Sequence, residues 1–270
     1  SGSKITVTNK MEFTSASIKL MGLENHGISH LIVPNTLKPS FGEAKKVLDS
    51  GVAFETSSGS LLTIKANAVS QLDSLANKMQ DLETMGVGYF DLEGLSIPLS
   101  TAELFVESAA NSSITFLNSP NLYIESSAEF SEVSSKASQL YSLGINTIEL
   151  KNGISIGAKE AYDIVTNESR LSFTGGEITD SNGIETSSLK NVLTTLKEKG
   201  LPVSSTFKPS IEVELTGSDQ ADAEQLCSMI IDGFRLLIPG GETLNLENVF
   251  LSKKNFELLA IADNYGTGSA

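Results

Sequence analysis

The 270-residue chain is poor in the residues that most often carry out chemistry, with one cysteine, two histidines, two arginines and no tryptophan. A single cysteine, Cys227, cannot form an internal disulfide, and its apolar neighbours at helical spacing predict a small buried side chain. No apolar run reaches the length of about 18 residues that a transmembrane helix needs, so we expect no membrane insertion. The sequence therefore indicates architecture more clearly than activity.

Basic residues are also scarce relative to acidic ones. The 33 Asp and Glu residues outnumber the 19 Lys and Arg residues, which gives a net charge of −14. This balance argues against nucleic-acid binding and against a basic membrane-surface patch, because both need an excess of positive charge. With 40% hydrophobic and only 19% charged residues, the chain lacks the composition of a disordered protein and can bury a core.

The feature most plainly present is an internal repeat. A glycine followed by an extended stretch recurs at Gly27, Gly86, Gly144 and Gly200, at intervals of 59, 58 and 56 residues. Each of the first three glycines is followed by a helix start of recurring form, Ser40-x-x-Glu43, Ser100-x-x-Glu103 and Gly157-x-x-Glu160. The first two have the pattern of a capping box, so we interpret the three glutamates as structural and not as acid/base groups.

The rest of the period recurs as well. A strand ending in phenylalanine is expected at residues 52–54, 114–116 and 171–173, with residues 234–238 at the matching place in the fourth unit. Turns follow at Ser57-Ser58-Gly59, Asn118-Ser119-Pro120, Gly175-Gly176 and Gly240-Gly241, so the glycine pairs supply backbone freedom and do not form a phosphate cradle. A second strand and a longer helix complete the unit. The strands are expected at residues 61–64, 122–124, 177–179 and 243–246, and the helices at 69–82, 130–140 and 189–196.

These elements predict an α/β fold with a largely parallel sheet, arranged as a solenoid-like array of strand, short helix, strand and longer helix with a period of about 58 residues. We expect a partial repeat or N-terminal cap at 1–26, repeats at 27–85, 86–143, 144–199 and 200–264, and a polar tail at 265–270. The incomplete first unit indicates a fragment of a longer array, so neighbouring repeats of a parent chain are the expected partners.

The stretch from Ile154 to Asn167, continued by Leu171 to Asp180 and by Ser187 to Gly200, resembles the α/β repeats of very large secreted bacterial surface proteins and adhesins. The resemblance covers about residues 27–264 and lies in the order and spacing of the strands and helices, without a diagnostic motif. It implies an extracellular or cell-surface location and type I secretion. Such proteins commonly carry calcium-binding Gly-Gly-x-Gly-x-Asp tracts, which this sequence lacks, so the resemblance assigns no functional residue.

Candidate metal ligands are few. His26 and His30 have the four-residue spacing of two ligands on one helix face, but Gly27 and the strand-like residues 31–33 make this stretch a turn into a strand. Asp180, before Ser181-Asn182-Gly183, and the pair Asp219 and Asp222 offer oxygen ligands for calcium. An Asx turn and a helix start explain these three residues more simply.

Candidate catalytic groups are equally sparse. The sequence has no Gly-x-Ser-x-Gly elbow, so it does not indicate a serine nucleophile. A glycosidase that uses two carboxylates remains an open alternative, because any two of the 33 acidic residues could converge in space. Tyr89, Phe90, Tyr123 and Tyr141 are interpreted as packing residues and not as a glycan-stacking surface. We therefore assign no catalytic, cofactor-binding or metal residue and expect no cofactor.

The sequence predicts a non-enzymatic structural or adhesive segment of a larger secreted protein, with a surface glycan or protein as a further partner. Two alternatives remain. A carbohydrate-active enzyme or glycan-binding module would use surface carboxylates in one deep cleft. A cytoplasmic scaffold would bind a partner protein along a concave face.

Overall fold

A computed structural model describes residues 2–212, 218–231, 234–237 and 249–257. Its internal contacts divide the chain into two compact units. Unit 1 comprises Ser1–Lys151 and Ile164–Thr174, and unit 2 comprises Asn152–Asp163 and Gly175–Ala270. The division runs through helix α7 (Ala158–Asn167).

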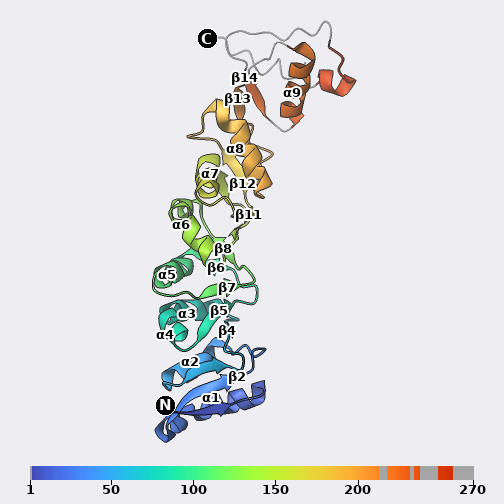
Figure 1. Ribbon diagram of the computed structural model, residues 1–270. Helices are drawn as coiled ribbons and strands as arrows, with labels where there is room; N and C mark the ends of the chain where they lie inside the picture. The colour runs from blue at the N-terminus through green and yellow to red at the C-terminus, as the bar shows by residue number, and fades with distance from the viewer. Residues whose placement is uncertain (1, 213–217, 232–233, 238–248, 258–270) are drawn as a thin grey trace. The chain divides into compact units, whose positions relative to one another are not determined.

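Unit 1 alternates strands and helices along the chain (Figure 1). Its strands are β1 (Ser3–Thr6), β2 (Ile28–Val33), β3 (Ala53–Thr56), β4 (Leu62–Lys65), β5 (Val87–Asp91), β6 (Ile97–Pro98), β7 (Thr115–Leu117), β8 (Asn121–Ile124), β9 (Thr147–Leu150) and β11 (Ser172–Thr174). Its α-helices are α1 (Lys10–Leu23), α2 (Phe41–Asp49), α3 (Leu72–Asn77), α4 (Met79–Thr84), α5 (Leu99–Ala109) and α6 (Phe130–Ser142). Short 3₁₀ helices precede β2, α3 and α6 at Glu24–His26, Val69–Gln71 and Ser127–Glu129.

Three parallel sheets organise these strands, in the orders β1-β2-β3, β4-β5-β7 and β11-β9-β8-β6. Every strand pairing within the described residues of both units is parallel. Because parallel neighbours need a crossover, helices connect many of the paired strands, as α2 connects β2 to β3 and α6 connects β8 to β9. The predicted α/β class with a largely parallel sheet is confirmed.

The strands form where apolar and polar residues alternate. In β3, β8 and β9 every second side chain is buried, which places one face of each strand against the core. The phenylalanines predicted at strand ends, Phe54, Phe116 and Phe173, are all buried in that core. Phe105 of α5 meets Phe116 edge-on, with ring centroids 4.9 Å apart. Side chains of helix α5 and strand β7 thus pack together in the same apolar core.

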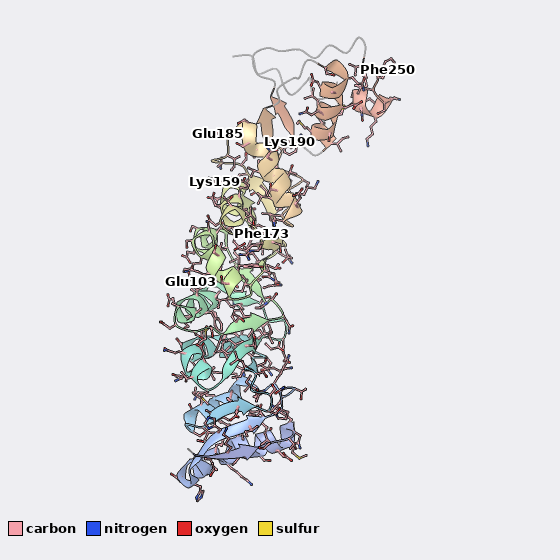
Figure 2. The ribbon with its side chains drawn as sticks, viewed as in Figure 1. Glu103, Lys159, Phe173, Glu185, Lys190 and Phe250 are labelled. Carbon is pink, nitrogen blue, oxygen red and sulfur yellow. The ribbon has the colours of Figure 1, made fainter. Side chains whose placement is uncertain are left out.

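Helix starts agree only partly with the sequence pattern. Ser40 and Glu43 form the predicted capping box at the start of α2. The capping box predicted at Ser100 is wrong, because α5 already begins at Leu99 and its N-cap residue, Pro98, makes no side-chain capping bond. Glu103, labelled in Figure 2, instead forms an ion pair with Lys136 of α6. The helix predicted over 69–82 is divided at Lys78, where the backbone leaves helical geometry at φ −106° and ψ 7°.

The repeated glycines stand at turns that require them. Gly86 and Gly144 have φ of +89° and +101°, a region that side chains rarely adopt. A Cβ atom would lie 2.8 Å from the Phe54 carbonyl oxygen at Gly86 and 2.9 Å from the Phe116 carbonyl oxygen at Gly144. The same kind of tight turn therefore approaches β3 at Gly86 and β7 at Gly144, and these two glycines are 58 residues apart.

The described residues of unit 2 include two pairs of parallel strands and two helices beside the first part of α7, with further helical backbone at 253–257. These elements are β10 (Ser155–Gly157) with β12 (Glu177–Asp180), β13 (Ser210–Glu212) with β14 (Arg235–Leu237), α8 (Thr186–Glu198) and α9 (Asp219–Ile231). The turn predicted at Gly240-Gly241, the strand predicted at 243–246 and the tail at 265–270 lie outside the described residues. The predicted repeat boundaries stay predictions.

Candidate functional site

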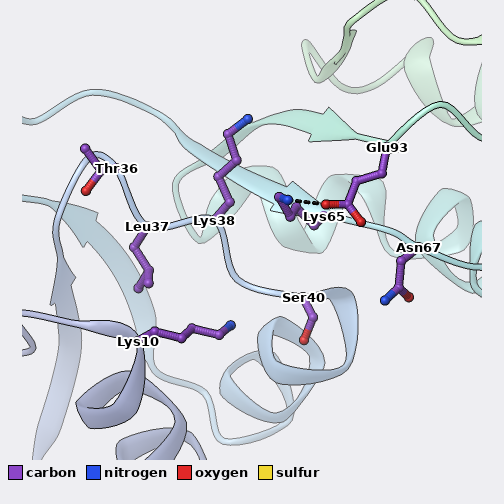
Figure 3. Close-up of a pocket in the computed structure, with 8 residues that line it drawn as sticks. All are labelled: Lys10, Thr36, Leu37, Lys38, Ser40, Lys65, Asn67 and Glu93. Carbon is purple, nitrogen blue, oxygen red and sulfur yellow. Dashed lines mark hydrogen bonds and ion pairs between the residues drawn. The ribbon is translucent and has the colours of Figure 1, made fainter.

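A pocket of about 580 Å³ lies in unit 1 where several strands end and helices begin (Figure 3). We call it the lysine pocket, and its lining residues are Lys10, Thr36, Leu37, Lys38, Ser40, Lys65, Asn67 and Glu93. Loops after the carboxyl ends of β2, β4 and β5 supply six of these residues, Lys65 is the last residue of β4, and Lys10 is the first residue of α1. The carboxyl ends of parallel strands are the usual place for ligand sites in α/β proteins.

Backbone contacts hold the two sides of the pocket together. The Lys65 amide donates to the Pro39 carbonyl at 2.8 Å, and Ser40 and Lys65 form a parallel bridge. Ser40 also caps α2, so the positive end of that helix dipole lies at the pocket. The lining residues are therefore fixed by main-chain structure at their bases and not by side-chain packing alone.

Each lysine of the pocket is paired with a carboxylate. Lys38 Nζ lies 2.7 Å from Asp91 Oδ2, Lys10 pairs with Glu43, and Lys65 pairs with Glu93. Two of the carboxylates lie deeper than their partners, since the side chains of Lys38 and Asp91 are 38% and 5% exposed and those of Lys10 and Glu43 are 53% and 15% exposed. For these two pairs the ammonium groups form the outer layer.

The pKa values of the buried carboxylates are lowered. Burial by itself would raise the pKa of Glu43, but hydrogen bonds from Lys10, Ser40 and Thr14 outweigh burial and lower this pKa from 4.5 to about 2. Burial likewise opposes ionisation of Asp91, yet Lys38, the Glu93 amide and Asn118 lower its pKa below the ordinary value. Both carboxylates are charged at neutral pH and hold the lysines in place.

The charge state of Lys65 limits the chemistry that the pocket can carry out. The hydrogen bond to Glu93 raises the pKa of Lys65 above its ordinary value. An amine that attacks a carbonyl must first lose its proton, whereas an ammonium that binds an anion must keep it. Lys65 is therefore suited to bind a negative group. An ammonium has three N–H donors, so a lysine held by one carboxylate can still donate to a ligand.

A second hollow of about 430 Å³ lies along α5, β7 and α6 and is lined by small and apolar residues, with Gln139 and several hydroxyls. None of its lining residues is charged. It offers no group that would orient a ligand as the lysines do, so the lysine pocket is the stronger candidate.

The histidines singled out in the sequence occupy the expected turn and strand. Gly27 has φ +77°, His26 is exposed in the 3₁₀ helix before this turn, and His30 lies in β2 with Nδ1 2.8 Å from Ser29 Oγ. Within the described ranges, no three His, Cys, Asp or Glu side chains gather as a metal site would require.

The other residues considered for chemistry are accounted for by structure. Asp180 accepts a hydrogen bond from the Asn182 amide at 3.1 Å, as an Asx turn predicts, and α9 starts at Asp219. Cys227 is buried, and burial raises the pKa of its thiol. Across the described part of the chain, no helix is both long and apolar enough to span a membrane.

The four aromatic residues interpreted as packing differ from one another. Phe90 is fully buried, and Tyr141 lies beneath the Arg170 guanidinium at 3.7 Å from the ring centroid. Tyr89 is 38% exposed, and its interpretation as a packing residue stays a prediction. Tyr89 and Tyr123 both occupy strand positions that alternate with buried ones.

Lys10, Lys38 and Lys65 are site residues that the sequence patterns do not predict. One signal was available in the uneven charge distribution, because residues 1–50 hold six lysines and four acids, whereas residues 51–270 hold 13 basic and 29 acidic side chains. Their convergence depends on three chain segments meeting, which spacing along the sequence does not reveal.

Comparison with known proteins identifies no family for this chain. No protein-family model matches the chain, and no curated protein matches it. A solved structure described as "QR15, an Aldolase" has a TM-score of 0.24 and 9% sequence identity, over 74% of this chain and 86% of that one. A likeness at this level assigns neither a fold family nor an aldolase activity to this chain.

The prediction of a non-enzymatic structural or adhesive segment is corrected at this point. One solved structure that the comparison returns is named as an enzyme and not as a surface repeat. The prediction that the chain is not an enzyme, its resemblance to secreted repeats and its expected location outside the cell stay predictions.

Proposed function

We propose that unit 1 binds a small anionic ligand in the lysine pocket, of the class of carboxylated or phosphorylated molecules that also carry hydroxyl groups. The observation that carries this proposal is the convergence of Lys10, Lys38 and Lys65, each oriented by a carboxylate, at one pocket. Lysines that are already held in place lose less conformational entropy when a ligand binds. The hydroxyls of Thr36 and Ser40 and the amide of Asn67 would bind the ligand's hydroxyl groups.

The size of the pocket is consistent with this ligand class. Small-molecule sites commonly enclose about 300–1,000 Å³, and the pocket of about 580 Å³ lies within this range. A nucleic acid is an unsuitable anion for this chain, because its many phosphates would meet a surface with a net charge of −14.

Calorimetric titration with citrate and with inorganic phosphate tests the proposal. Lys65 is the residue to change, because its partner Glu93 is 39% exposed and is not left buried without a counter-charge. We expect Lys65→Gln to weaken citrate binding about tenfold, the loss of one charge-assisted hydrogen bond. Lys45→Gln is the matched control, because Lys45 pairs with Asp49 on the surface of α2 and does not line the pocket. Equal losses in the two variants, or none in Lys65→Gln, would refute a specific site.

We also propose that the chain is a solenoid-like array with a period of about 58 residues. Two equivalent contacts support this proposal. The Phe54 amide donates to the Met85 carbonyl at 2.9 Å, and the Phe116 amide donates to the Leu143 carbonyl at 2.7 Å, each beside a glycine with positive φ. In an experimental structure, residues 27–85 should superimpose on residues 86–143 with their strands and helices in the same order. A different pairing order in the two segments would exclude the array.

A further inference from the structure

Asp91 is the least exposed of the three carboxylates that pair with the pocket lysines, and three segments of unit 1 donate hydrogen bonds to it. Its Oδ2 atom accepts a hydrogen bond from Lys38 Nζ at 2.7 Å. Its Oδ1 atom accepts hydrogen bonds from the Glu93 amide and from Asn118 Nδ2, both at 3.2 Å. The two oxygens therefore have different partners: Oδ1 is held by two turns of the chain, and Oδ2 faces the lysine.

Asn118 reaches Asp91 from the turn after β7 and has an uncommon backbone conformation. Asn118 and the next residue, Ser119, have φ of +62° and +41°, and both are exposed. Side chains rarely adopt this region, and asparagine is among the residues that adopt it most readily. Asn118 does not itself line the lysine pocket, so its amide contacts the site through Asp91.

The other donor to Oδ1, Glu93, also has a left-handed backbone. Glu93 has φ of +50°, and its carboxylate pairs with Lys65 in the pocket (Figure 3). Non-glycine residues held in such conformations cluster at functional sites. Asp91 therefore holds Lys38 directly and supports the turn that carries the partner of Lys65.

A contact of the same form occurs 58 residues later with a different donor. Ser96 and Glu149 follow Lys38 and Asp91 by 58 residues each. Ser96 Oγ donates to Glu149 Oε2 at 2.5 Å, and Asn121 Nδ2 donates to the same oxygen at 3.1 Å. At both places a carboxylate is held by an asparagine amide and by a donor 53 residues earlier. At the first place that donor is a lysine that lines the pocket, so a structural contact there also carries a charge that can bind an anion.

We propose that Asn118 is a positioning residue of the anion site, which fixes the Asp91 carboxylate so that the Lys38 ammonium stays in place at the pocket. This inference rests on the proposed binding of an anion by the pocket lysines. An ammonium that is already held loses less conformational freedom when a ligand binds. Asn118 therefore raises the affinity for the ligand without touching it.

Calorimetric titration of Asn118→Gly and Ser119→Gly with citrate tests the inference. Glycine adopts positive φ readily, so both variants should keep the turn. Each removes one side-chain hydrogen bond, from Asn118 to Asp91 or from Asn146 to Ser119, the latter at 2.9 Å. We expect Asn118→Gly to weaken citrate binding about fivefold and Ser119→Gly to change it by less than about twofold.

Two further measurements distinguish a positioning residue from a merely structural one. In a Lys38→Gln background, where glutamine keeps a donor for Asp91, Asn118→Gly should weaken citrate binding by less than about twofold, because the lysine that it positions is gone. The ¹⁵N chemical shift of Lys38 Nζ in the unliganded chain should change in Asn118→Gly and stay unchanged in Ser119→Gly.

The outcomes separate this inference from the anion site on which it rests. Equal citrate affinities in Asn118→Gly and Ser119→Gly, the same loss in both Lys38 backgrounds, or an unchanged Lys38 Nζ shift in Asn118→Gly would overturn the positioning role while wild-type binding stands. A wild-type chain that binds no citrate would refute the anion site, and the positioning role with it.

Discussion

Glu43 joins several parts of unit 1 through one side chain. Its carboxylate accepts hydrogen bonds from the Ser40 amide at 2.9 Å and from Thr14 Oγ1 at 2.9 Å, and it pairs with Lys10. It therefore caps α2, contacts α1 and orients one lysine of the pocket. A single carboxylate with so many donors is stabilising only while it is ionised.

The lowered pKa of Glu43 predicts a pH dependence of stability. The folded pKa of about 2 lies below the unfolded value of 4.5, so the stabilisation is complete above about pH 5 and is lost as the pH falls toward 2. We expect Glu43→Gln to lower the free energy of unfolding by about 2 kcal/mol at pH 6, since Gln retains the cap acceptor but not the charge. Urea unfolding at pH 6 and pH 3 measures the difference.

The control for this prediction is Glu132→Gln, at an exposed position of α6. It should change stability by less than about 0.5 kcal/mol at either pH. A destabilisation by Glu43→Gln that is the same at pH 6 and at pH 3 would show that the charge of Glu43 contributes nothing.

Glycine substitutions separate backbone strain from steric clash. Gly59 and Gly144 both have positive φ, but a Cβ at Gly59 meets no atom within 4 Å, whereas a Cβ at Gly144 lies 2.9 Å from the Phe116 carbonyl oxygen. We expect Gly59→Ala to cost about 1 kcal/mol of unfolding free energy and Gly144→Ala about 3 kcal/mol or more. Thermal and urea unfolding of the two variants would measure this. Similar losses in both would refute the close approach.

At the scale of elements, α5 is held against the sheet by aromatic packing. Phe105 is fully buried, and its ring lies 6.1 Å from that of Phe90 and 4.9 Å from that of Phe116. The three rings come from α5, β5 and β7, so Phe105 contributes more to the position of α5 than any capping bond, because Pro98 forms none.

Truncation of Phe105 should therefore be strongly destabilising. We expect Phe105→Ala to lower the free energy of unfolding by about 4 kcal/mol, from lost burial and the cavity left behind. Leu104→Ala, at the adjacent half-buried position, should cost less than half as much. Urea unfolding compares the two variants, and comparable losses would mean that α5 does not pack through Phe105.

Elements could be predicted where the sequence pattern is local. The apolar spacing at 130–140 predicts α6, and strands are found at the three places expected for Phe54, Phe116 and Phe173, although each strand runs one or two residues past its phenylalanine. The start of α5 and the break at Lys78 were missed, because Pro98 and the local backbone override the capping and periodicity signals. Sequence patterns predict the buried face of a helix or strand more accurately than they predict the residues at which it begins and ends.

At the scale of the whole molecule, a parallel α/β protein follows from the sequence, but its candidate site does not. Gly27, Gly86 and Gly144 mark the strands through local turn chemistry. Lys10, Lys38 and Lys65 come together only because α1, the loop before α2 and the end of β4 meet in space. Long-range convergence of that kind carries no local signal.

The most direct test of the proposed anion site is amide chemical-shift mapping during a citrate titration of the isotopically labelled chain. Binding in the lysine pocket predicts saturable shifts at residues 36–38, 40, 65–67 and 93, with the largest changes near Ser40 and Lys65. Shifts confined to the hollow along α5 and α6, or no saturable shift at any residue, would contradict an anion site in unit 1.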